Sequence, residues 1–228
     1  MHWRMSVLSF LFAALLVTSA QRVVMVHEEP RHRIVHTTPA LRVLDVQIAP
    51  GDTTLFHTHD TPITYVTLGT SSTDQRALGG AWNGTVPRDP PPGRVGAVRG
   101  VVGYVGQPLT HRVTNVGRTL FRLIAVANRG PGDADAASAA PGEEVGQPNA
   151  WFRYSRVTLA PGDRYEFEPS VPTVVVLTSD ARFGVERPDG WRSSVERPGG
   201  SLVLETGRSV SVFGDGTAPA DLVFVEVR

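Results

Sequence analysis

Short runs of alternating apolar and polar residues, separated by Gly, Pro and Asp, make up most of this 228-residue chain. The first clear run covers residues 41–48 and ends at Pro50-Gly51. A two-residue period over four to eight residues is typical of a half-buried β-strand. Similar runs lie at 63–68, 101–105, 111–116, 120–126, 152–159, 173–178, 182–186, 201–205 and 221–227. No helical period extends beyond two turns, so the pattern predicts an all-β sandwich or barrel.

An internal repeat divides the chain into two halves. Residues 46–52 (VQIAPGD) recur as residues 157–163 (VTLAPGD), 111 positions later, and the runs after Pro62 and Pro172 are a looser match. Between the halves, residues 130–149 are small and polar, as in a linker. We therefore expect an N-terminal arm at 21–40, a first domain at 41–129, a linker at 130–149 and a second domain at 150–228.

The first twenty residues have the pattern of a secretory signal peptide. Arg4 precedes a 12-residue apolar stretch, and Thr18-Ser19-Ala20 supplies small residues before a cleavage point. An uncleaved N-terminal anchor is the alternative, although a spanning helix needs about 20 apolar residues. The interpretation predicts a secreted or periplasmic protein with no membrane contact after signal cleavage.

Composition excludes several classes of function. The 22 basic and 22 acidic residues give a formal net charge of zero, which argues against a nucleic-acid partner. Because the chain has no cysteine, disulfides, thiolate metal sites and thiol catalysis are excluded. Every basic residue is arginine, so a lysine Schiff base is excluded as well.

The strongest chemical signal is a His-x-His pair in the first half. His57 and His59 are two residues apart, so on a strand both imidazoles point to the same face. A third ligand from a neighbouring strand would let the protein bind a divalent metal through three side chains. His111 is the candidate for this third ligand. Imidazole suits zinc, iron, copper and nickel.

These residues resemble the two motifs of the cupin family. Gly51, a five-residue gap, the His57/His59 pair and a closing Gly69 follow the first motif. The second motif is matched by Gly100, His111 and Asn115 at the family spacing, with Gly106 and Pro108 interchanged relative to the family's turn. The resemblance implies two tandem cupin-type jelly-roll β-barrels, with His57, His59 and His111 binding a divalent metal inside the first. It leaves the metal open among iron, zinc, manganese and nickel.

The chain departs from the family in two places. Ile63 and Thr64 stand where the family has its glutamate ligand, so the site has no carboxylate from that position. In the second half no histidine occurs, and Val210 falls where His111 would recur, which predicts a degenerate second domain. Glu166 and Glu168 share a strand face there, either as an acid/base pair or simply as a solvated face.

Three functions remain open on the sequence. The first is an exported, metal-dependent cupin oxygenase or isomerase acting on a small molecule. The second is a bicupin that binds a small ligand or a sugar without turnover, and the third is a structural or interaction protein with a metal-free relic site. Thr64, Thr67 and Gln107 are the candidate polar groups beside the histidines, and Trp82 is a candidate flap residue. Edge strands of jelly rolls often pair between subunits, which makes a homodimer an expectation.

Overall fold

The computed structural model describes residues 21–228; the predicted signal peptide, residues 1–20, lies outside this range. This part of the chain has 18 β-strands and one short 3-10 helix, η1 (Gly103–Val105), and no α-helix. The all-β prediction is therefore confirmed. Within the described residues there is no helix of the length and hydropathy that a bilayer crossing requires.

Two sheets face each other in the first jelly roll. The inner sheet has five strands in the order β2 (His32–Thr37), β3 (Leu41–Ile48), β9 (Phe121–Asn128), β5 (Ile63–Gly69) and β7 (Val98–Val101). The outer sheet has the order β1 (Val23–Met25), β4 (Phe56–His59), β8 (Leu109–Asn115) and β6 (Thr73–Ala77). A strand was expected over 101–105, but it ends at Val101, and the glycine-rich segment that follows forms η1 instead.

The second jelly roll repeats this plan. Its inner sheet has the order β10 (Glu143–Glu144), β11 (Phe152–Leu159), β18 (Ala220–Val227), β13 (Thr173–Leu177) and β16 (Ser201–Leu204). Its outer sheet has the order β12 (Arg164–Phe167), β17 (Val210–Gly214), β14 (Phe183–Glu186) and β15 (Arg192–Val195). In both units the two sheets stay separate, so each is an open jelly roll rather than a closed barrel.

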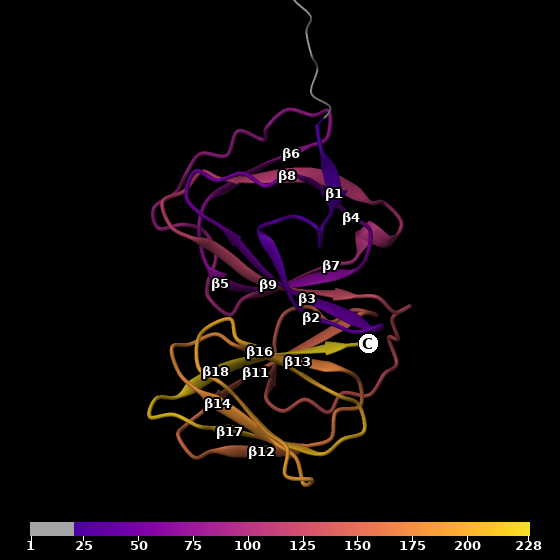
Figure 1. The fold of residues 1–228 in the computed structure, drawn as a ribbon, viewed down its shortest axis with the longest axis vertical. Coiled ribbons are helices and arrows are strands. Elements are labelled where there is room, and N and C mark those ends of the chain that lie inside the picture. Colours follow the sequence, from indigo (N-terminus) through magenta and orange to yellow (C-terminus); the bar gives the residue numbers. More distant parts are fainter. Residues whose placement is uncertain (1–20) are drawn as a thin grey trace, which may run out of the picture.

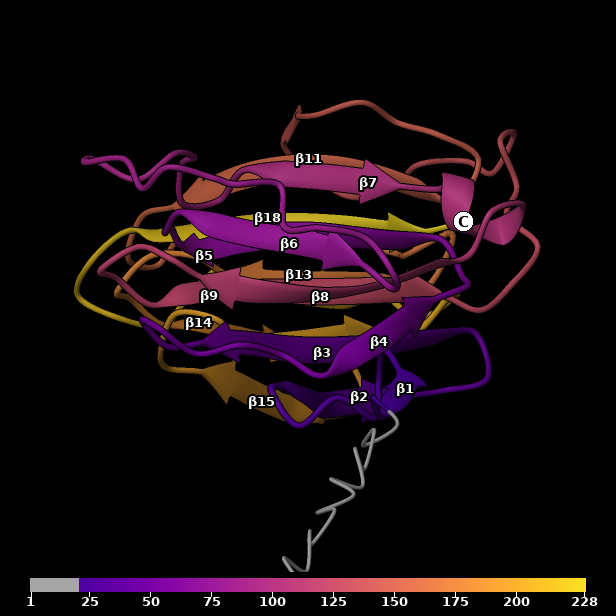
Figure 2. The ribbon, with the colours of Figure 1, turned by 90° about the horizontal axis from the view of Figure 1, so that it is seen from above.

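The two inner sheets pack on each other in the middle of the molecule, and the two outer sheets lie at its ends (Figure 1). The contact between them is a hydrophobic core shared by both units, in which Leu41 and Val126 meet Phe152 and Val225, all of them fully buried. Alternation along β3 explains this arrangement, because Leu41 and Val43 face the second unit while Leu44 and Val46 face the interior of the first. Seen from above, the strands of both units run in similar directions (Figure 2).

The repeated Ala-Pro-Gly-Asp turn has the same hydrogen bonds in both units. Gly51 and Gly162 both have positive φ, 78° and 85°, which glycine adopts readily. The Gly51 amide donates to the carbonyl of Asn115, and the Gly162 amide donates to that of Gly214. Asn115 and Gly214 are therefore equivalent, and Val210, four residues before Gly214, occupies the position of His111, as the sequence predicts.

The predicted arm and linker both take part in the fold. The arm supplies β1 and β2, one to each sheet of the first unit. The linker runs along the second unit, where the buried carboxylate of Glu226 accepts hydrogen bonds from Ser138 Oγ and from the amides of Ala139 and Ala140. The exact domain boundaries stay predictions.

Candidate metal centre

The three predicted histidines lie side by side between the sheets of the first jelly roll. His57 and His59 point to the same side of β4, and the antiparallel pairing with β8 places His111 directly opposite His57. One ring nitrogen from each of the three lies within 4.8 Å of the others, and all three side chains are buried. The two-residue period on β4 and the register of β8 thus bring together the residues that the sequence motifs select.

Hydrogen bonds on the far side of two rings turn one nitrogen of each toward the centre. His57 Nδ1 lies 3.0 Å from the carbonyl oxygen of Leu55, and His111 Nδ1 lies 3.1 Å from Oε1 of Gln75. Both oxygens can only accept, so each Nδ1 carries the proton and each Nε2 keeps a free lone pair. Partners of this kind fix the tautomer of metal-binding histidines.

The spacing of the inner nitrogens suits a single metal ion. His59 Nε2 and His111 Nε2 are 3.1 Å apart. Two nitrogens bound to one ion at about 2.0–2.1 Å, at tetrahedral or octahedral angles, are separated by roughly 2.9–3.4 Å. With His59 Nδ1 buried and without a hydrogen-bond partner among the described residues, this group of rings is incompletely satisfied by the protein alone. The donor set therefore fits a divalent metal.

Burial keeps these ligands uncharged. Desolvation, together with the neighbouring imidazoles, lowers the pKa of His59 to about 2 and that of His111 to about 3. Desolvation also lowers the pKa of His57. Neutral imidazole is the form that binds metal, so protons compete weakly at this site near neutral pH.

The N-terminal arm contributes buried side chains beside the three histidines. The ring of His32 packs edge-on against that of His57 with centroids 4.7 Å apart. Its Nδ1 lies 2.7 Å from the carbonyl oxygen of Val26, and burial lowers its pKa to about 3. Next to it, the buried carboxylate of Glu29 accepts hydrogen bonds from the amides of Arg31 and Leu55. The carboxylate therefore holds the residue whose carbonyl orients His57.

The histidines open into a cavity of about 470 Å³ between the two sheets. Its floor is apolar and comes from the inner sheet, with Leu44, Ile63 and Leu123 among its residues. Beside the histidines, its polar lining is Tyr65, Thr67, Thr73, Gln75, Asn83, Thr85, Arg99 and Tyr104. None of the described residues that line it is aspartate or glutamate. A cavity of this size accommodates a small organic molecule.

The structure shows which of the expected polar residues line the cavity. Thr67 lines the cavity, but Thr64, at the opposite parity on β5, faces away and donates to the carbonyl oxygen of Arg99. Gln107 is exposed and lies outside the cavity, and Gln75 is the amide that contacts His111. The expected flap residue, Trp82, also lies outside the cavity lining, on the outer face of β6 and β8.

Among residues 21–228, no carboxylate takes the place of the missing family glutamate. Ile63 is buried in the cavity floor, and Asp60, which follows His59, is exposed. Tyr104 packs against His59 with ring centroids 4.9 Å apart, and burial raises the pKa of its phenol and of Tyr65. The group is thus three neutral histidines facing open cavity.

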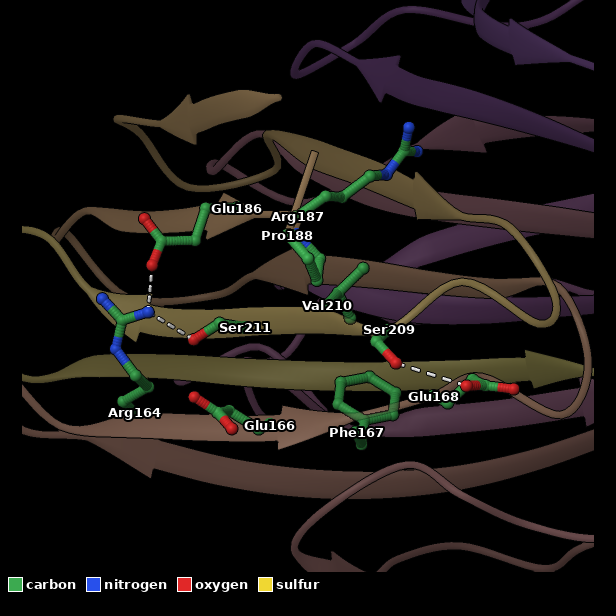
Figure 3. A pocket seen from close by; sticks show the side chains of 10 residues that line it. All are labelled: Arg164, Glu166, Phe167, Glu168, Glu186, Arg187, Pro188, Ser209, Val210 and Ser211. Atoms are coloured by element: carbon green, nitrogen blue, oxygen red, sulfur yellow. Dashed lines mark hydrogen bonds and ion pairs between the residues drawn. The ribbon is translucent and has the colours of Figure 1, made fainter. Parts of the chain in front are cut away.

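The second jelly roll has an apolar interior at the matching position. Phe167 pairs with Val210 across β12 and β17, in the register that His57 and His111 occupy in the first unit, and both contribute to the hydrophobic core. The expected pair Glu166 and Glu168 is exposed and lines a shallow pocket of about 430 Å³ on the surface (Figure 3). There Glu168 accepts from Ser209, while Glu166 forms no ion pair with any described residue, which favours a solvated face.

Comparison with known proteins supports the fold. No family model and no curated protein matches the sequence. Among solved structures, salicylate 1,2-dioxygenase from Pseudaminobacter salicylatoxidans matches with a TM-score of 0.56 at 11% identity, over 87% of this chain and 77% of that chain. A cupin 2 conserved barrel domain protein from Leptotrichia buccalis matches at 0.50 and 11%, over 86% and 87%. AerE from Microcystis aeruginosa matches at 0.53 and 9%, over 88% and 98%. The chain therefore has the cupin fold, and the similarity extends over both units.

Proposed function

We propose that this protein is an exported, metal-dependent cupin oxygenase whose first jelly roll binds a divalent metal through His57, His59 and His111 and acts on a small organic molecule. The observation that carries the proposal is the convergence of three neutral imidazoles on one point, beside an open cavity of about 470 Å³. Of the candidate metals, ferrous iron suits this function best, since it would supply the activation of dioxygen.

The lining of the cavity favours oxygenation over isomerisation. Isomerisation needs a general acid or base with a pKa near neutrality. Among the described lining residues there is no carboxylate, burial raises the pKa of both phenols, and burial holds the pKa of His32 near 3. The salicylate dioxygenase among the structural neighbours belongs to the same reaction class.

Residues of this chain have distinct parts in the proposed function. Gln75 and the Leu55 carbonyl orient two of the ligands, and the apolar floor excludes water from the substrate. Arg99 lines the same cavity and is the cation available to an anionic substrate, since among residues 21–228 no carboxylate lies within ion-pair distance of it. Small organic carboxylates are therefore the first substrates to test.

The second candidate function is binding without turnover. The observation in its favour is the same shortage of acid and base groups in the cavity, because a binding site needs none. Turnover of a loaded chain distinguishes the two functions.

The test is oxygen consumption by residues 21–228 loaded with ferrous iron under anaerobic conditions. The panel comprises small carboxylates and phenols, salicylate among them, with a His57→Ala/His111→Ala double variant as the control. Consumption that depends on substrate and disappears in the double variant would support the oxygenase. Tight binding of a panel compound with no oxygen uptake by the iron-loaded chain would favour the binding function instead.

A further inference from the structure

A charged cluster lies on the outer face of the β4-β8-β6 sheet, on the side away from the histidines. Arg76 on β6 and Arg112 on β8 are directly opposite each other in the antiparallel register. Each follows a residue of the metal centre, Gln75 or His111, so each side chain points to the other face of the sheet. Like charges at directly opposed positions destabilise a sheet unless something compensates them.

Two aromatic rings hold the arginines in place. The guanidinium carbons of Arg76 and Arg112 lie 5.3 and 5.0 Å from the ring centroid of Phe56. They also lie 5.5 and 5.0 Å from the ring centroid of Trp82. Cation–π contacts of this length are favourable, and they fix the two flat guanidinium groups next to each other before any ligand arrives.

The pair has no acidic partner among residues 21–228, since neither guanidinium lies within ion-pair distance of a carboxylate. The nearest acid on the same strand face, Asp74, accepts instead from the amides of Gln75 and Gly84 and from the hydroxyl of Thr85. Both Nε atoms are buried and have no hydrogen-bond partner in the described part of the chain.

We propose that Arg76 and Arg112 form a binding site for a doubly charged tetrahedral oxyanion, phosphate or sulfate, either free or as a monoester. The planar guanidinium matches such oxygens with paired N–H donors, and two adjacent guanidiniums match two negative charges. Trp82 lies against the pair, and its ring offers a surface on which the organic part of an ester can stack. This site is separate from the metal centre and independent of the proposed oxygenase.

The experiment measures oxyanion binding to metal-free residues 21–228 by calorimetry and by thermal unfolding. Sodium phosphate and sodium sulfate are titrated against sodium chloride at equal ionic strength, and phenyl phosphate serves as the monoester probe. The test variant is Arg112→Gln. Arg118→Gln is the matched control, because Arg118 is exposed on the turn after β8 and has no ion pair within the described residues.

We expect saturable binding to the parent and to Arg118→Gln, and a dissociation constant at least about tenfold larger in Arg112→Gln, the loss typical of one charged hydrogen-bonding partner. Tighter binding of phenyl phosphate than of phosphate would support the ester form, and the reverse would support the free anion. The proposal is overturned if the parent shows no saturable response beyond that to chloride, or if Arg112→Gln, folded by circular dichroism, binds as tightly as the parent.

Discussion

Replacing Gln75 with leucine tests how the metal centre is built. The amide oxygen of Gln75 is the acceptor for His111 Nδ1 at 3.1 Å, and this contact leaves His111 Nε2 free to bind metal. Leucine has a similar volume but accepts no hydrogen bond, so the ring of His111 would lose both its fixed tautomer and its orientation. Because Gln75 is exposed on an edge strand, the fold should tolerate the change.

The magnitude follows from this single contact. Loss of an outer partner of a metal-bound histidine typically weakens metal affinity by about 10- to 100-fold, or roughly 1.4–2.7 kcal/mol. The other partner of the site is a backbone carbonyl, that of Leu55, which a substitution does not remove. Gln75 is therefore the position at which the orientation of a ligand can be altered without touching a ligand.

The assay is competition for zinc between residues 21–228 and a fluorescent chelator of known affinity. Gln107→Leu is the matched control, because Gln107 is exposed and lies outside the cavity. We expect weaker zinc binding in Gln75→Leu and unchanged binding in Gln107→Leu. Equal zinc affinity in the parent and both variants would refute the view that Gln75 orients His111.

Three further predictions concern stability. In the metal-free chain, His59 and His111 stay neutral when folded but titrate near pH 6.5 when unfolded, so the unfolded state binds more protons between about pH 6.5 and 3. The free energy of unfolding, measured with urea, should therefore fall as the pH drops through that window, by up to about 1.4 kcal/mol per pH unit for each histidine. A His59→Gln variant with the same pH dependence as the parent would contradict this. Glu29→Ala leaves the Leu55 amide unpaired, and we expect a loss of about 1–3 kcal/mol in the same measurement. Glu166→Ala is the control and should cause no loss, because Glu166 is exposed and forms no ion pair with any described residue. Phe152→Ala opens a cavity in the core between the two jelly rolls and should cost about 3–5 kcal/mol; a loss below about 1 kcal/mol would show that this core does not hold the units together.

The sequence was sufficient for the features that depend on periodicity and motif spacing. The two-residue period places His57 and His59 on one face, and the motif spacing identifies His111 as their partner. The comparison of the two halves also places Val210 at the position of His111, and the structure pairs Val210 with Phe167. Each of these inferences uses only the local geometry of a strand or the resemblance of a motif.

Other parts of the site depend on which strands become neighbours. Glu29 and His32 reach the centre because the arm joins both sheets: β1 pairs in parallel with β4, and His32 of β2 pairs with Val46 of β3. Nothing in the local pattern of the arm indicates these pairings. Gln107 was selected because it is near His111 in the chain, whereas Gln75 contacts His111 from the neighbouring strand. Thr64 and Thr67 were both candidates for the cavity lining, but strand alternation allows only one of them to face the cavity. Thr67 is that residue.

The most direct test of the account is the metal content of residues 21–228, purified without chelators or a histidine tag and analysed by mass spectrometry. The His57→Ala/His111→Ala variant is prepared in parallel, and circular dichroism shows whether it folds. Three converging neutral histidines predict close to one divalent metal per parent chain and its loss in the folded variant. A parent chain that binds no metal, even after incubation with iron, zinc, manganese and nickel, would contradict the metal centre and leave a relic site.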